Sequence, residues 1–152
     1  MAKPVNGEPI RIYGWREDVT IKGAPKPVLA KLDTGAKTSS IHAEKKEMFE
    51  RDGEKWMRFV FTDPTAKDEG FKVRIEAPLV RVARIKDPGG ESEAREVVML
   101  DMKIGERSMR AEFTLKNRKN MLAPILIGRT LLKELGAVDP GRTHLADQKI
   151  IR

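Results

Sequence analysis

The sequence predicts a mostly β protein, folded as a small closed or nearly closed β-barrel with one short helix in its C-terminal half. Short segments in which apolar and polar residues alternate recur along the chain, as they do in half-buried strands. Turn-forming Gly, Pro, Asp and Asn residues separate these segments at short intervals. A single stretch near the end, residues 129–135, has helical spacing instead.

The chain is long enough to form one domain with its own core, because it has 152 residues, of which 39% are hydrophobic. We expect a single domain over residues 1–152. Its core should run from about residue 10 to residue 150, and residues 1–9 should be flexible. The sequence contains neither an internal repeat nor a low-complexity tract.

The first half of the chain contains several predicted strands. Alternation and turn residues place them at residues 10–15, 18–21, 28–32, 55–61 and 70–76. Pro25 and Pro27 exclude a central strand between the second and third of these segments and mark a loop. Residues 44–51 are compatible with either a helical turn or a strand extension.

The second half of the chain predicts two hairpins. Residues 79–85 and 95–100 flank a glycine-rich tip at residues 87–92, and residues 97–104 and 109–115 form the second hairpin. A buried strand, a helix with a glycine cap and a closing strand should then follow, at residues 124–128, at residues 129–135 ending at Gly136, and at residues 144–146 with 150–151.

The composition limits the possible functions. A net charge of +7 favours an acidic partner, and nucleic acid is the first candidate for such a charge. However, the basic residues are scattered and only 5% of residues are aromatic, so we do not expect a nucleic-acid binder. The chain has no cysteine, no apolar run near the ~20 residues of a membrane span, and a polar start at residues 1–9. We therefore expect a cytoplasmic protein without a signal peptide.

The stretch at residues 29–36 carries the chemistry. An apolar, strand-like run ends there in Asp33, Thr34 and Gly35. Gly35 permits a tight turn, and Thr34 supplies a hydroxyl that both donates and accepts hydrogen bonds. This arrangement suits a carboxylate that is held at a fixed point on a rigid strand. Taken alone, the same three residues are also typical of a strand end followed by a polar turn.

Two further elements make the pattern specific. A glycine-tipped hairpin follows, and then an apolar strand that ends in Gly128 and Arg129 and leads directly into a leucine-rich helix. In this order, residues 33–36 and residues 125–132 resemble the retropepsin family of aspartic peptidases. The resemblance spans residues 28–135 and implies a small retropepsin-like β-barrel whose hairpin acts as a flap.

Other segments narrow the resemblance. Residues 14–17, 31–43 and 112–115 are similar to a bacterial branch of that class, the RimB-like family that also carries the name ATP-dependent zinc protease. The family implies a peptidase that works beside an ATP-grasp ligase, which adds glutamate tails to a ribosomal protein. The peptidase would hydrolyse those acidic, poly-glutamate tails.

The chemistry of aspartic peptidases requires two carboxylates that share a proton. The chain has one Asp-Thr-Gly, at Asp33, Thr34 and Gly35. The second carboxylate must therefore come from another chain, so we expect a homodimer in which Asp33 faces Asp33. Thr34 and Gly35 would lock the two loops together. The hairpin tip with Gly89 and Gly90 would close over a peptide substrate.

One position departs from the retroviral pattern, in which an Asp follows Asp-Thr-Gly-Ala and pairs with the Arg of Gly-Arg. Here that position is Lys37, so Lys37 and Arg129 are two cations beside the catalytic loop. We expect them to bind acidic side chains or a carboxylate terminus, assisted by Arg81, Arg84 and Lys86 of the flap. The alternative is that these cations are ordinary solvated residues. The full set of expected substrate-binding residues is Ala36, Lys37, Arg84, Lys86, Gly89, Gly90 and Arg129.

We expect neither a metal nor another cofactor. The only histidines are His42 and His144, whereas catalytic zinc usually has three protein ligands. His42 follows the key loop closely enough to approach the site, so a metal there is a minor alternative to a structural hydrogen-bonding role or a substrate contact. The chain also lacks a phosphate-binding Gly-rich loop with Lys, so any ATP dependence would belong to a partner. The main alternative to a peptidase is a non-catalytic module that binds an acidic peptide or the ligase.

Overall fold

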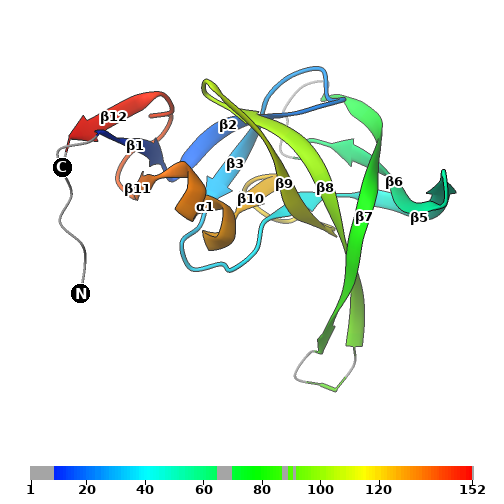
Figure 1. The fold of residues 1–152 in the computed structure, drawn as a ribbon. Helices are drawn as coiled ribbons and strands as arrows, with labels where there is room; N and C mark the ends of the chain where they lie inside the picture. Colours follow the sequence, from blue (N-terminus) through cyan, green and yellow to red (C-terminus); the bar gives the residue numbers. More distant parts are fainter. Residues whose placement is uncertain (1–8, 65–69, 87–88, 91, 152) are drawn as a thin grey trace.

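The computed structural model describes residues 9–64, 70–86, 89–90 and 92–151, which form mostly strands and one short helix (Figure 1). The element bounds are β1 (Pro9–Gly14), β2 (Arg16–Ile21), β3 (Val28–Leu32), β4 (Ser40–His42), β5 (Glu44–Arg51), β6 (Glu54–Thr62), β7 (Lys72–Lys86), β8 (Ser92–Ile104), β9 (Arg107–Lys116), β10 (Ile125–Ile127), α1 (Arg129–Leu135), β11 (Ala137–Asp139) and β12 (Gln148–Ile151). Within the described residues, no helix is long and apolar enough to cross a membrane.

The larger sheet closes into a barrel, as the sequence predicted. Its strand order is β2-β3-β10-β4-β9-β8-β7-β6-β5, and a further pairing of β2 with β8 joins the first strand to the sixth. β2, β3, β10, β4, β9 and β8 therefore form a closed ring. β7, β6 and β5 continue the sheet on one side, and the far end of the β7–β8 hairpin projects away from the barrel (Figure 1).

Alternating side chains from the ring and from β6 fill a single core. Phe59, Phe61, Phe113, Ile41 and Ile127 are completely buried within it. The burial of each such side chain contributes about 1.5–3 kcal/mol to stability. β3, β10 and β4 are neighbours in this ring, and each is paired with another strand on both sides. The loops at their ends are therefore attached to a rigid frame.

A second, smaller sheet has the order β11-β1-β12 and places the first strand beside the last one (Figure 1). Glu17 links this sheet to the barrel. Its buried carboxylate accepts hydrogen bonds from the backbone N–H groups of Gly14 at 2.6 Å, Leu145 at 2.7 Å and Ala146 at 3.3 Å. Glu17 belongs to one of the segments on which the family resemblance rested, and here its role is structural.

Several expected elements differ in detail. Residues 44–51 form a strand, β5, which settles the choice left open by the sequence. The segments 70–76 and 79–85 are parts of one long strand, β7, which has an irregularity between Leu79 and Arg81. Residues 144–146 lie outside any strand. Residues 1–8 and positions 87, 88 and 91 of the expected hairpin tip lie outside the described residues.

Candidate active site

The backbone fixes Asp33 at the end of β3. Its N–H donates to the carbonyl of Ile127 at 2.9 Å, which continues the pairing of β3 with β10 beyond Leu32. Its carboxylate Oδ1 accepts a hydrogen bond from the N–H of Gly35 at 2.8 Å. The side chain is 31% exposed. The loop therefore fixes the orientation of the Asp33 carboxylate, which remains accessible to solvent.

Gly35 contributes more than flexibility. A Cβ built on Gly35 would lie 3.1 Å from Asp33 Oδ1, so a larger residue would crowd the carboxylate that the Gly35 N–H holds. Lys31 Nζ lies 3.9 Å from Asp33 Oδ2, which places one cation beside the acid on the same strand. Thr34 and Gly35 are both exposed.

The segment that enters α1 clamps the Asp33 loop from the other side. Arg129 donates its N–H to the Ala36 carbonyl at 2.7 Å and its Nη1–H to the Thr34 carbonyl at 3.1 Å. Thr130 donates both its N–H, at 3.1 Å, and its hydroxyl, at 2.8 Å, to the Lys37 carbonyl. Arg129 therefore braces the loop through backbone carbonyls, while its side chain stays exposed. We call residues 33–39 and 128–130 together the loop clamp.

Gly128 is required by the close approach of the two halves of the loop clamp. A Cβ on Gly128 would lie 2.5 Å from the carbonyl oxygen of Thr38. Its N–H donates to the buried Ser39 hydroxyl at 3.0 Å, and the Ser39 carbonyl accepts the N–H of Thr114 at 3.0 Å. Ser39 thus ties the loop to both β9 and β10, a role that sequence reasoning missed because a polar loop residue gives no signal of burial.

His42 is a buried structural residue in this chain. Its Nδ1 accepts the N–H of Arg118 at 2.8 Å, so the neutral ring carries its proton on Nε2, which lies 3.0 Å from Glu44 Oε2. Glu44 also accepts the Thr62 hydroxyl at 3.1 Å. The bond from His42 holds the pKa of Glu44 below its ordinary value, assisted by the Thr62 hydroxyl and nearby cations against the opposing effect of desolvation.

Arg118 extends the His42 network into the loop before β10. Its buried guanidinium donates from Nε to the Ala123 carbonyl at 3.0 Å and from Nη1 to the Ser40 hydroxyl at 3.1 Å. Burial lowers the pKa of Arg118. The Arg118 side chain thus connects the loop before β10 to Ser40, next to the loop clamp. Its position in a polar sequence segment gave no indication of this role.

The described residues contain no group of three or more His, Cys, Asp or Glu side chains that could hold a metal ion. Both ring nitrogens of His42 have protein partners. The other histidine, His144, lies 3.1 Å from Asp18 through its Nε2. The two histidines therefore take part in separate interactions and do not share a site.

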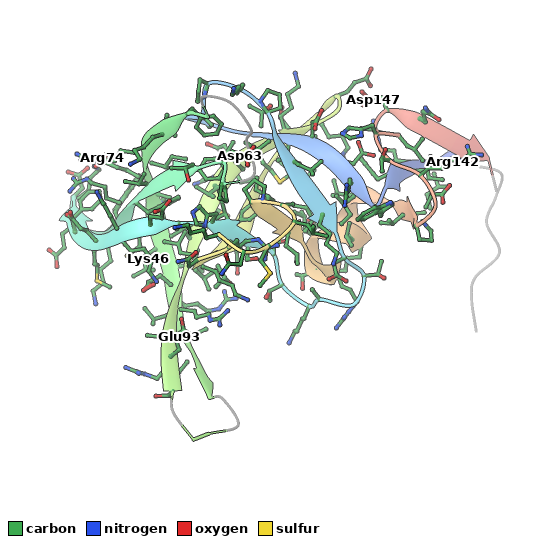
Figure 2. All side chains as sticks on the ribbon, turned by 180° about the vertical axis from the view of Figure 1, so that it is seen from behind. Lys46, Asp63, Arg74, Glu93, Arg142 and Asp147 are labelled. Carbon is green, nitrogen blue, oxygen red and sulfur yellow. The ribbon has the colours of Figure 1, made fainter. Side chains whose placement is uncertain are left out.

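The structure does not bring the expected flap residues to Asp33. Arg84 is exposed and pairs with Ala94 across the β7–β8 hairpin. The outer end of that hairpin, where Glu93 is labelled, lies apart from the barrel in both views (Figures 1 and 2). Lys86 pairs with Ser92 through its backbone, whereas Gly89 and Gly90 are exposed. Positions 87, 88 and 91 of the tip lie outside the described residues.

Comparisons with known proteins agree with this fold. The model of the RimB-like family, described as retropepsin-like aspartic endopeptidase RimB, matches residues 12–149. The crystal structure of Lpg0085, a protein of unknown function from Legionella pneumophila, superposes with a TM-score of 0.72 at 34% sequence identity. The superposition covers 88% of this chain and 95% of that one.

Curated relatives carry a different name. A protein of Desulfotalea psychrophila named "Probable alpha-L-glutamate ligase" is 37% identical over 74% of this chain, and one of Parasynechococcus marenigrum with the same name is 33% identical over 88%. The matched region is 24% of the first and 28% of the second. The chain thus spans about a quarter of the length of these relatives.

Proposed function

Because this chain belongs to the RimB-like family of retropepsin-like aspartic endopeptidases, we propose that it hydrolyses peptide bonds with Asp33 from each of two chains. The observation that carries the proposal is the placement of the Asp33 carboxylate. It sits at the end of a central strand, accepts the Gly35 N–H at 2.8 Å and stays 31% exposed. A carboxylate that served only to cap a turn would not need the surrounding loop clamp.

The reaction needs two carboxylates, and the chain supplies a single Asp-Thr-Gly. In the proposed homodimer, close approach of the two Asp33 side chains leaves one ionised and one protonated. The ionised carboxylate takes a proton as the water oxygen bonds to the carbonyl carbon, and the other carboxyl protonates the carbonyl oxygen. The C–N bond then breaks as the carboxyl that took the water proton gives it to the amide nitrogen, and the other carboxylate regains a proton from a hydroxyl of the tetrahedral intermediate. Exposed Thr34 and Gly35 are available to contact the second loop.

The proposed substrate is an acidic chain of the poly-glutamate type. The net charge of +7 favours such a substrate, and so do Lys31 on β3 and the loop-clamp cations Lys37 and Arg129. The relatives named as glutamate ligases connect this domain to glutamate chemistry. Because the match covers about a quarter of those proteins, we assign ligation to a partner and hydrolysis to this chain.

A second function is favoured by the same relatives. A domain that occurs within proteins named as glutamate ligases could hold a glutamate tail for the ligase without cutting it. In that case Asp33 would serve no chemical step, and the basic residues of the loop would carry the affinity.

One experiment separates these functions. Hydrolysis and binding of a hexaglutamate peptide are measured for the wild type and Asp33→Asn, with and without a metal chelator. The matched control is Asp18→Asn, which alters an exposed aspartate beside His144. Cleavage that is lost in Asp33→Asn, retained in the control and insensitive to chelator supports the peptidase. Binding without cleavage by any form supports the binding module and rules out the peptidase on this substrate.

A further inference from the structure

A pocket of about 450 Å³ adjoins the loop clamp and is separate from the Asp33 carboxylate. It lies between residues 37–39, the strands β7, β8 and β9, and the helix α1. Asp33 is not among its lining residues. We infer that this pocket is a second subsite, which takes one glutamate side chain of an acidic chain whose scissile bond lies at Asp33. The inference rests on the proposed function and names how the substrate is recognised away from the reacting atoms.

The floor of the pocket is apolar. Val97, Ala111 and Leu131, which line it, are between 3% and 7% exposed and belong to the barrel wall and to α1. Met99 completes this surface. A glutamate side chain carries two methylene groups before its carboxylate, so its stem can cover such a floor while its charge stays at the rim. An aspartate has one methylene group fewer and would cover less of it.

The rim of the pocket carries two cations that are already ion-paired and one that is not. Arg81 Nη1 lies 2.5 Å from Glu112 Oε1, and Arg110 Nε lies 3.3 Å from Asp101 Oδ1. These carboxylates hold the two guanidinium groups in place, and each guanidinium keeps further N–H donors. Lys37 is exposed and makes no ion pair with any described residue. Lys37 is therefore the cation that an incoming carboxylate would neutralise.

Glu134 limits how much negative charge the pocket accepts. It lines the pocket from α1, and its carboxylate is paired with none of the described residues. Three cationic and two anionic side chains thus line one cavity, but Arg81 is matched with Glu112 and Arg110 with Asp101, which is not part of the lining. Lys37 is then the one cation of the lining without an ion pair to a described residue, which suits a single carboxylate. A second one would be repelled by Glu134, so removal of that charge should strengthen binding of an acidic chain.

The pocket and the proposed catalytic loop are held in a fixed relation. Lys37 follows Asp33 by four positions, and its carbonyl receives both the N–H and the hydroxyl of Thr130. Thr130 itself lines the pocket. Because Asp33 does not line the pocket, a peptide must extend beyond its scissile bond to occupy both places. The subsite therefore predicts that affinity depends on substrate length.

The test compares fluorescein-labelled diglutamate and hexaglutamate peptides, with binding measured by fluorescence anisotropy on the Asp33→Asn background. Lys37→Gln and Arg110→Gln should each weaken hexaglutamate binding about tenfold and change diglutamate binding less than twofold, as expected for loss of a charged contact. Glu134→Gln should tighten hexaglutamate binding about threefold at low salt. Lys133→Gln, on the same helix but outside the pocket, is the control and should have no effect.

Other outcomes overturn the inference. Equal losses for both peptide lengths would place Lys37 at the Asp33 loop alone, and unchanged affinity in Arg110→Gln and Glu134→Gln would show an unused pocket. The apolar floor should favour the two methylene groups of glutamate over the single one of aspartate. Hexa-aspartate that binds as tightly as hexaglutamate would therefore also contradict the inference. Because binding is measured apart from cleavage, a wild type that binds by length but cuts nothing would refute the proposed peptidase and leave the subsite supported.

Discussion

The loop clamp and the outer β7–β8 hairpin carry the two halves of the expected site, and they are built differently. In the loop clamp, backbone N–H and C=O groups from β3, β10 and α1 meet around Asp33, with Gly128 against Thr38. In the outer hairpin, Arg84 is exposed and its described partner is the opposite strand. The comparison indicates that this chain fixes the position of its carboxylate by its own backbone contacts, whereas the described residues of the outer hairpin pair with each other.

The largest effect is expected from breaking the loop clamp at Gly128. A Cβ there would lie between 2.5 and 2.8 Å from three backbone atoms of Thr38, so the backbone itself would have to shift. Gly128→Ala should lower the free energy of unfolding by about 3 kcal/mol, as in strongly overpacked sites. Chemical denaturation measures this loss. Gly141→Ala, where the nearest atom is a side-chain oxygen at 3.4 Å, is the control and should change stability little.

A smaller effect is expected from Ser39→Ala, which removes one hydrogen bond of the clamp. The N–H of Gly128 would lose its buried acceptor, now 3.0 Å away. The expected loss is about 1–2 kcal/mol of unfolding free energy. Hydrogen exchange of the Gly128 amide should also accelerate more than that of amides in β6. Uniform acceleration across the barrel would mean that Ser39 supports global stability and has no special role in the clamp.

The His42 network beneath the clamp predicts a modest acid sensitivity. The pKa of Glu44 is below its ordinary value of 4.5 because His42 and Thr62 stabilise the charged carboxylate. The corresponding stability is present above the unfolded-state value and is lost as the pH falls through the lower, folded-state pKa. The Glu44 side chain is 42% exposed, so solvent screening should keep the contribution below about 1 kcal/mol.

Denaturation of the wild type and Glu44→Gln at several pH values measures that contribution. The stability difference between the two proteins should be constant near neutral pH and should shrink below about pH 4.5, because both side chains are then uncharged. A difference that stays constant down to pH 3 would show that the charge of Glu44 does not contribute to folding.

The smallest effect on stability is expected in the outer hairpin. Arg84→Ala removes an exposed side chain and should change the unfolding free energy by less than about 0.5 kcal/mol. If the hairpin contacts an acidic substrate, the same substitution should raise KM for a glutamate peptide and leave kcat nearly unchanged. An equal KM would remove Arg84 from the binding site and confine recognition to the loop clamp and its adjoining pocket.

The parts of the fold that sequence reasoning captured are those with one clear apolar pattern. β3 at Val28–Leu32 and α1 at Arg129–Leu135 have the predicted bounds, since both bury an apolar face and end at Asp33 and Gly136. β5 could not be assigned, because most of its residues are exposed on both faces. The sequence predicts two separate segments, residues 70–76 and 79–85, where the structure has the single strand β7, and Pro78 between them lies within the strand, opposite Trp56.

The site was only partly predictable for a similar reason. The Asp-Thr-Gly and Gly-Arg motifs are visible in sequence, because each needs particular residue types in order. Ser39 and Arg118 were not, since burial of a polar side chain is set by tertiary contacts that a linear pattern does not reveal. Arg110 reaches the pocket by its register on β9, which is likewise invisible before the strands are paired.

Mixing wild-type and Asp33→Asn chains tests the central claim most directly, because the claim is that one Asp33 from each of two chains forms the catalytic site. Equal amounts are unfolded, refolded together and assayed on hexaglutamate at constant total protein. If both carboxylates are required, only wild-type pairs are active, and activity should fall to about one quarter of the wild-type value. Activity of about one half would show that each chain works alone and would contradict the shared site.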